Sequence, residues 1–307
     1  MKVTMLSKAD YAGSGYKMWE AISTHTDIDI DLFSLHGGGK YGHPRRNRVK
    51  KGNIALQERV NSSDVIHIKG DWPLHNNYMG LKIMHKPVVQ TVGGSLFRKN
   101  HHGGIERWAM NFFEPASLNT ASTPDLLYSD YGNIWTPHPI DCDDVPRSWK
   151  RSDPVIFVHS PTNTSKKGTK FILAVFEAMK GRVDFETRII PKVSFKEILK
   201  LRSESTIFFD QFKVGFYGNS AIESMQYGVP TCAWISPEAF EQSNGALENC
   251  PVLTLPVRKV SHWAEMLTKV VNSDMDELSK DTKEWCDQVH GYKAIALQWK
   301  KLYESVV

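Results

Sequence analysis

One short segment, GNSAIESMQYGVP at residues 218–230, combines a small-residue turn, an expected helix and a carboxylate. Backbone N–H groups at the start of a helix lack intrahelical partners, so those of Gly218, Asn219 and Ser220 could bind a phosphate. Glu223 follows one turn later, and an ionised carboxylate accepts two hydrogen bonds at once, which suits a pair of sugar hydroxyls. The alternative is an acid that only complements the dipole of its helix.

Two lysines precede a second helix start. In HSPTNTSKKGTKF, residues 159–171, an expected strand ends, a polar loop carries Lys166 and Lys167, and Gly168 turns the chain into a helix. Lysines beside helix N–H groups can hold a phosphate or diphosphate, and solvated surface lysines are the alternative. We favour the phosphate interpretation because the loop follows a strand, where open α/β sheets bind their ligands.

A glycine-rich turn opens the first expected helix, in YAGSGYKMWEAI at residues 11–22. Gly13, Ser14 and Gly15 permit a close backbone approach to an anion. A tight strand-to-helix turn without a ligand needs the same residues, and neither a GxGxxG fingerprint nor a GK[ST] P-loop supports the ligand interpretation.

Two basic segments are free of acidic residues. Residues 40–52, KYGHPRRNRVKKG, carry six lysines and arginines, and FRKNHHGG at 97–104 is the second such segment. Positive charge attracts anionic partners, and a solvated surface is the alternative. The candidate acceptor-binding residues in these segments are Arg45, Arg46, Arg48, Lys50, Lys51 and Arg98.

Composition places the chain among ordinary globular proteins. Its 307 residues are 41% hydrophobic and 23% charged, with a net charge of +4. The four cysteines show no CxxC spacing, which predicts reduced thiols. We find no apolar run long enough to span a membrane, and the first residues are too polar for a signal peptide. We therefore expect a cytoplasmic protein.

Strand and helix patterns alternate along the whole chain, which predicts parallel sheets covered by helices. Strands are expected at 2–7, 27–35, 63–70, 86–94, 153–160, 185–190, 205–210, 230–236 and 251–256. Helical periodicity lies between them and at the end of the chain. The pattern predicts an α/β protein with two doubly wound, Rossmann-like domains that face each other, and ligands at the carboxyl ends of their strands.

The order and spacing of these motifs resemble those of GT-B glycosyltransferases. The resemblance is in particular to the retaining, sucrose-synthase-like group, which is similar to glycosyltransferase family 4. HSPTNTSKKGT and, further along, DQFKVGFYGNSAIESMQYGVP are similar to the donor half of that fold. WTPHPID at 135–141 is similar to its interdomain linker, and two prolines there break regular structure. The final WKKLYESV resembles the last helix of the fold. The resemblance covers most of the chain and is strongest at 155–235.

The resemblance implies a domain organisation and a role for each motif. Residues 1–138 would form an acceptor-side Rossmann-like domain and 139–286 a nucleotide-sugar donor domain, with a C-terminal helix at about 287–307 packed back on the first. The donor would be a UDP-sugar, and no cofactor is expected. Lys167, with Lys166, would hold its diphosphate; Gly218, Asn219 and Ser220 would present N–H groups; Glu223 would bind the ribose; Gly13, Ser14 and Gly15 would approach from the other domain.

The sequence departs from the family pattern at two places. Many members carry an additional glutamate eight residues before the one that corresponds to Glu223, and that position is Gly215 here. The family's contact with the donor sugar is therefore absent. Relatives also often place a histidine near the end of the strand that here ends in Gly93 and Gly94, and these glycines could admit an acceptor or sugar.

The expected mechanism is electrostatic. Lys167 and helix N–H groups can stabilise a diphosphate leaving group without a metal, and the DCDD sequence at 141–144 lies in the linker, so we expect no essential metal. We favour retention, in which the departing phosphate takes the acceptor proton. An inverting enzyme would need a base, for which Asp71 is the candidate; His67 is an alternative that better fits a buried strand.

The basic segments favour an anionic acceptor. Our preferred interpretation is DNA with hydroxymethylated pyrimidines, as glycosylated by some viral enzymes of this fold, which would then act in the host cytoplasm. Phosphate contacts would dominate affinity for such an acceptor. The alternative acceptor is a cell-surface glycan or lipid-linked sugar near anionic lipid. A non-catalytic protein that binds a nucleotide sugar or nucleic acid is the alternative of another class.

Overall fold

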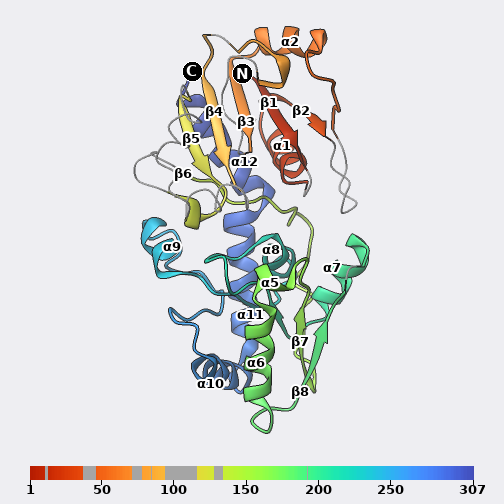
Figure 1. Ribbon diagram of the computed structural model, residues 1–307, viewed down its shortest axis with the longest axis vertical. Coiled ribbons are helices and arrows are strands. Elements are labelled where there is room, and N and C mark those ends of the chain that lie inside the picture. Colours follow the sequence, from red (N-terminus) through yellow and green to blue (C-terminus); the bar gives the residue numbers. More distant parts are fainter. Residues whose placement is uncertain are drawn as a thin grey trace. The chain divides into compact units, whose positions relative to one another are not determined.

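The computed structural model describes residues 1–10, 13–36, 46–70, 78–83, 85–93, 116–127, 134–191 and 193–307. The chain divides into two compact units. Unit 1 comprises Met1–Pro139 together with Tyr292–Val307, and unit 2 comprises Ile140–Gly291. Each unit is built on a parallel sheet with helices packed against it (Figure 1), so the predicted α/β class with two domains is confirmed.

The described part of unit 1 contains a six-stranded parallel sheet with the order β2-β1-β3-β4-β5-β6. Its strands are β1 (Lys2–Ala9), β2 (Asp29–His36), β3 (Val65–Lys69), β4 (Val88–Val92), β5 (Leu118–Ala121) and β6 (Ile134–Trp135). Residues 3–7 of β1 and all five residues of β4 are buried. Strands that are buried along their length are typical of a sheet covered on both faces.

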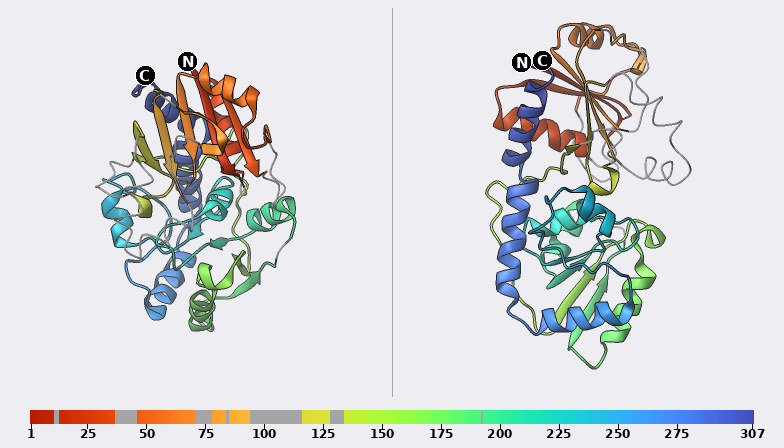
Figure 2. Two further views of the ribbon diagram at one scale, coloured as in Figure 1. Left: turned by 45° about the horizontal axis from the view of Figure 1, so that its top comes forward. Right: turned by 90° about the vertical axis from the view of Figure 1, so that its left-hand side faces the viewer.

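Helices cover both faces of this sheet. Within the described residues of unit 1 they are α1 (Ser14–His25), α2 (Ile54–Asn61), the short 3₁₀ helices η1 (Tyr78–Gly80) and η2 (Pro124–Leu126), and α12 (Tyr292–Glu304). On one face α1 and α12 pack side by side (Figure 2), and Ile22 and Trp299 share one core cluster. On the other face Leu56 and Val60 of α2 pack over Ile66.

His67 in β3 attaches the C-terminal helix to the sheet. Its Nδ1 lies 2.7 Å from the Tyr303 hydroxyl and its Nε2 lies 2.8 Å from Thr91 Oγ1. The ring also packs against Trp299, with 4.6 Å between centroids. Complete burial lowers the pKa of His67 to about 3. His67 is therefore a core residue that joins β3, β4 and α12.

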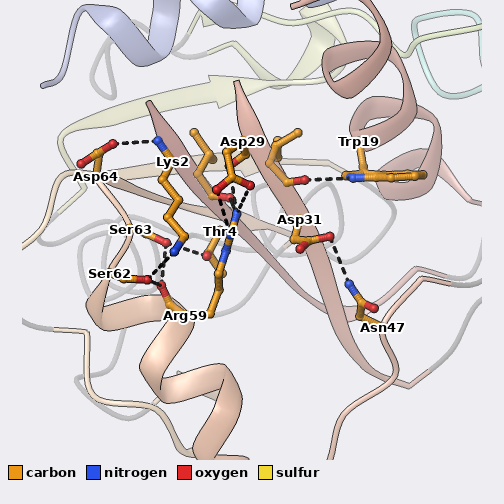
Figure 3. A network of polar contacts seen from close by, with 12 residues as sticks. Lys2, Thr4, Trp19, Asp29, Asp31, Asn47, Arg59, Ser62, Ser63 and Asp64 are labelled. Carbon is orange, nitrogen blue, oxygen red and sulfur yellow. Dashed lines mark hydrogen bonds and ion pairs between the residues drawn. The ribbon is translucent and has the colours of Figure 1, made fainter. Parts of the chain in front are cut away.

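Polar contacts at the amino ends of β1 and β2 fix α2 against the sheet edge (Figure 3). The Arg59 guanidinium donates to both carboxylate oxygens of Asp29, at 3.0 and 2.9 Å. Lys2 donates through its backbone N–H to Asp64 and through Nζ to Ser62, each at 2.7 Å. A bidentate arginine–carboxylate contact constrains orientation more than a single hydrogen bond does.

Unit 2 contains a four-stranded parallel sheet with the order β10-β9-β7-β8. Its strands are β7 (Val155–His159), β8 (Phe185–Ile189), β9 (Ile207–Phe209) and β10 (Thr231–Cys232). The strand expected at 251–256 is a wrong prediction, because only Leu253 pairs, in a single bridge to Cys232. Pro251 and Pro256 flank it, and proline has no N–H for a sheet ladder.

The helices of unit 2 are α5 (Thr164–Lys167), α6 (Thr169–Met179), α7 (Phe195–Ser203), α8 (Asn219–Met225), α9 (Pro237–Gln242), α10 (Val260–Val271), α11 (Met275–Trp285) and the π-helical turn η4 (Cys286–His290). Helices α6 and α10 lie against each other at the core (Figure 1). Phe157, Phe176 and Phe209 interlock there, with ring centroids 4.8 to 5.5 Å apart. This core supports the strand ends that carry the candidate site.

Candidate functional site

Lys167 lies at the end of α5, a single helical turn that follows β7. Asn163 caps this turn by accepting a hydrogen bond from the Lys166 N–H at 2.8 Å, and Gly168 ends it with a φ of 74°. The Lys167 ammonium forms an ion pair with the Asp210 carboxylate, and their side chains are 14% and 1% exposed. Lys166 is exposed. Only one of the two predicted lysines is therefore held in place by an acid.

Asp210 follows β9 and organises the loop that leads into α8. One of its carboxylate oxygens pairs with Lys167, and the other accepts a hydrogen bond from the Gly218 N–H at 2.6 Å. A Cβ atom on Gly218 would lie 3.5 Å from Lys167 Nζ. Lys167 and the start of α8 are thus immediate neighbours, and the Gly218 N–H already has a partner within the protein.

Glu223 belongs to a second buried ion pair. The Glu223 and Arg202 side chains are 8% and 6% exposed, and the guanidinium Nη1 donates to Glu223 Oε2. Arg202 comes from the last turn of α7, and it also donates to Ser160 Oγ at 3.0 Å and to Ser220 Oγ at 3.3 Å. We call these four residues the Arg202 cluster. It links the end of β7, α7 and α8.

The two ion pairs lie at one edge of the unit 2 sheet. Strands β7 and β9 are parallel neighbours, so the segments that follow their carboxyl ends emerge side by side. Open α/β sheets bind ligands at such an edge. The predicted donor-binding residues that the structure brings together here are Lys167, Gly218, Asn219, Ser220 and Glu223.

Sequence reasoning did not identify the partners in these pairs. Asp210 was visible only as the polar end of an expected strand. Arg202 looks like a basic residue in the last turn of its helix, where it would complement the helix dipole. No spacing in the sequence connects Arg202 with Glu223, because the contact depends on how α7 packs against α8.

The glycine-rich turn of unit 1 is capped by an acid of its own. Asp10 accepts hydrogen bonds from the N–H groups of Gly15 at 2.8 Å and Tyr16 at 2.9 Å. A Cβ atom at Gly15 would lie 3.2 Å from the Asp10 carboxylate carbon, and Gly13 has a φ of 68°. The cap accounts for Gly15, and the left-handed backbone accounts for Gly13. A contact of Gly13, Ser14 and Gly15 with a donor stays a prediction.

Among the predicted acceptor-binding residues, Arg46 has internal partners. Its guanidinium forms an ion pair with Asp31 at 2.9 Å and lies 3.9 Å from the ring centroid of Trp19. The side chains of Arg48, Lys50 and Lys51 are exposed. The predictions for Arg45, Asp71 and Arg98 concern residues outside the described ranges.

Local geometry explains the departures at Gly215 and Gly93. Gly215 has a φ of 89°, and a Cβ there would lie 3.3 Å from Ser236 Cβ and Oγ. Other residues adopt a left-handed backbone only at a cost. At Gly93 a Cβ would lie 2.5 Å from Ser122 Oγ, so this glycine permits close packing within the sheet. Gly94 lies outside the described residues.

The described ranges contain neither a membrane-spanning helix nor a cluster of metal-ligating side chains. No helix there combines the length and apolar character needed to cross a membrane. In the same part of the chain, no three histidine, cysteine or acidic side chains gather closely enough to hold a metal ion.

Comparison with known proteins gives a match in structure alone. No protein-family model and no curated protein sequence matches the chain. Its fold is similar to that of Anabaena HepE in complex with UDP-glucose, at 12% identity and a TM-score of 0.67, covering 99% of this chain and 100% of that one. It is also similar to sucrose-phosphate synthase from Thermosynechococcus elongatus, at 13% identity, 99% coverage of both chains and a TM-score of 0.65.

A third structural neighbour is the lipopolysaccharide outer core galactosyltransferase WaaB in its apo form. The match has 11% identity and a TM-score of 0.63, and it covers 99% of this chain and all of WaaB. The fold of the chain is that of the GT-B glycosyltransferases. The predicted fold class is therefore confirmed over nearly the whole chain.

Proposed function

We propose that the protein is a glycosyltransferase that moves a sugar from a nucleotide diphosphate sugar, in the first instance a UDP-sugar, to an acceptor hydroxyl. One observation carries this proposal. Lys167 and the start of α8 are immediate neighbours at the carboxyl edge of the unit 2 sheet, in a fold whose solved neighbours include HepE bound to UDP-glucose. That edge is where open α/β sheets bind ligands.

In this proposal the diphosphate binds to Lys167, with the exposed Lys166 beside it. Lys167 exchanges its contact with Asp210 for a phosphate oxygen, and both partners of the new contact are charged, which makes the hydrogen bond strong. Asn219 and Ser220 add backbone N–H groups. Gly218 contributes its N–H only when Asp210 releases it, because that hydrogen bond is 2.6 Å long in the structure.

Glu223 is proposed to accept hydrogen bonds from the ribose hydroxyls of the nucleotide. Arg202 donates to this carboxylate and is itself held by Ser160 and Ser220, so the carboxylate has a fixed orientation. A carboxylate offers about four lone-pair positions, so a hydrogen bond from Arg202 does not exhaust its capacity to accept others.

Catalysis would rest on stabilisation of the leaving group. The positive charge of Lys167 stabilises the negative charge that develops on the departing diphosphate, and this role requires no metal. We propose that this phosphate also takes the proton of the acceptor hydroxyl, which gives retention, as in the sucrose-synthase-like group that the sequence resembles. We further propose that the protein acts in the cytoplasm, since all four cysteines are free thiols.

For the acceptor we propose a hydroxymethylated pyrimidine in DNA. The exposed Arg48, Lys50 and Lys51 support an anionic acceptor, because basic side chains neutralise backbone phosphates. A cell-surface glycan or lipid-linked sugar is the other candidate, and the acceptor experiment distinguishes the two.

The donor experiment measures UDP release from a panel of UDP-sugars by the parent protein, Lys167→Met and the control Lys170→Met. Lys170 is an exposed lysine of α6 in the same region of the chain. We expect Lys167→Met to lower the rate about 100-fold or more and Lys170→Met to leave it unchanged. Failure of the parent to consume any nucleotide sugar would refute the enzyme proposal, and nucleotide binding without turnover would favour a non-catalytic binding protein.

The acceptor experiment incubates the protein and the active donor with DNA that contains hydroxymethylcytosine or hydroxymethyluracil. We expect the mass of the modified base to increase by one sugar residue. No increase with either base, together with transfer to a glycan or lipid-linked acceptor, would overturn the DNA assignment and leave the donor assignment intact. The anomeric configuration of the product and turnover in EDTA test retention and metal independence.

A further inference from the structure

Arg202 is the most highly connected buried charge of unit 2 that the proposed chemistry does not yet use. It is buried, and its guanidinium donates to side chains from two other segments, Ser160 after β7 and Ser220 and Glu223 in α8. The same guanidinium lies 5.4 Å from the ring centroid of Phe208. All three acceptors lie in segments that follow the carboxyl ends of β7 and β9.

Stability alone does not account for this pair. Burying two charges costs desolvation energy, and replacing a buried ion pair with apolar side chains is often neutral or stabilising. An arginine does offer geometric control, since its planar guanidinium holds several acceptors in fixed directions, which a lysine cannot do. Here three acceptors are held at once, so the orientation of the Glu223 carboxylate is tied to β7 and α7.

We infer that Arg202 is a positioning residue that orients the Glu223 carboxylate toward the ribose, and that it thereby sets a preference for ribonucleotides over deoxyribonucleotides. This inference rests on the proposed function, in which Glu223 binds the ribose hydroxyls. Arg202 touches neither the sugar nor the phosphates in this account. It acts through Glu223, and Ser160 and Ser220 hold it in position.

The expected preference follows from the strength of charged hydrogen bonds. A hydrogen bond to a carboxylate contributes roughly 10- to 100-fold in binding. We therefore expect the parent to bind UDP about 10-fold or more tightly than 2′-deoxy-UDP or 3′-deoxy-UDP. If the carboxylate loses its fixed orientation, UDP loses this advantage, whereas the deoxynucleotides lose little.

The experiment measures the dissociation constants of UDP, 2′-deoxy-UDP and 3′-deoxy-UDP by titration calorimetry with the full-length protein. The variants are Arg202→Lys, which keeps the charge but not the planar fork, and Glu223→Gln. The control is Lys200→Gln on the same helix, whose side chain is 77% exposed. We expect Arg202→Lys and Glu223→Gln to reduce the ribose preference to about 2-fold, and Lys200→Gln to retain it. A merely structural role would lower affinity for all three nucleotides equally.

Ser160→Ala provides a second variant should Arg202→Lys fail to fold. It removes the acceptor of Arg202 Nε without removing a charge, and we expect a partial fall in the ribose preference. The inference is overturned if Glu223→Gln loses the preference while Arg202→Lys or Ser160→Ala keeps it, and in that case the proposed function stands. If the parent binds none of the three nucleotides, the proposed function fails together with the inference.

Discussion

Replacement of Gly215 tests why this chain lacks the acid that many members of the group its sequence resembles place there. Gly215 lies in the loop between β9 and α8, with a φ of 89°. Its carbonyl oxygen accepts a hydrogen bond from the Ser236 N–H at 3.0 Å, which holds the loop against the start of α9. Gly215→Ala adds only a Cβ atom, which a glutamate would also have. It therefore isolates the free-energy cost of a Cβ atom at this position.

The loss of folding stability expected for Gly215→Ala has two parts. A left-handed backbone at a residue with a Cβ costs about 1–2 kcal/mol. The added Cβ would also lie 3.3 Å from Ser236 Cβ and Oγ, and Ser236 Oγ caps α9 by accepting from the Ala239 N–H at 3.2 Å. Disturbance of such a cap costs about 1 kcal/mol. The expected loss for Gly215→Ala is therefore about 2–3 kcal/mol, and Gly215→Glu should lose at least as much.

The assay is urea denaturation, in which the free energy of unfolding is taken from the transition that includes unit 2. The matched control is Gly245→Ala, because Gly245 has a φ of 83° but no atom within 4 Å of an added Cβ. We expect the control to lose only the backbone part, about 1–2 kcal/mol. Equal losses in the two variants would refute the steric argument. A gain in stability or in UDP-sugar turnover with Gly215→Glu would refute the whole explanation for the missing acid.

Two further predictions concern buried titratable groups. Burial lowers the pKa of His67 from 6.5 to about 3, so the unfolded state binds a proton that the folded state does not as the pH falls from 6.5 to about 3. Unit 1 should lose about 1.4 kcal/mol of stability per pH unit in this window, and denaturation curves of His67→Asn should lack that component; the same pH slope in both proteins would contradict it. Lys167→Met and Asp210→Asn each leave one member of a buried pair alone and should cost about 3 kcal/mol, while the double variant should cost at least about 1 kcal/mol less than their sum. Additive losses in the same assay would show that the pair is not coupled.

Much of the fold could be predicted because several strands, among them β4 and β7, are buried along most of their length. Continuous apolar runs such as Val155–Val158 identify strands regardless of their neighbours. The prediction was wrong at 251–256, where the apolar pattern is present but the segment pairs only through Leu253. Strands β5 and β6 were not predicted, because polar residues interrupt the LNTA sequence of β5 and the two residues of β6 belong to no longer apolar run.

Residues of the candidate site could be predicted only where the sequence immediately around them indicates their role. Lys167 and Glu223 stand in recognisable strand-loop-helix contexts, and the structure brings both to one sheet edge. Their partners Asp210 and Arg202 lie 43 and 21 residues away along the chain, and only the packing of the unit brings each pair together. Similarly, the turn at Gly15 looked like a ligand loop because the sequence does not reveal that Asp10 uses its N–H group.

The most direct test of the central claim is a crystal structure of the protein with bound UDP. The proposal predicts a diphosphate oxygen within about 3 Å of Lys167 Nζ, with the contact to Asp210 exchanged, and the ribose hydroxyls on the Glu223 carboxylate. UDP bound elsewhere, with the Lys167–Asp210 and Arg202–Glu223 pairs intact and untouched by the nucleotide, would contradict the assignment of this edge as the donor site.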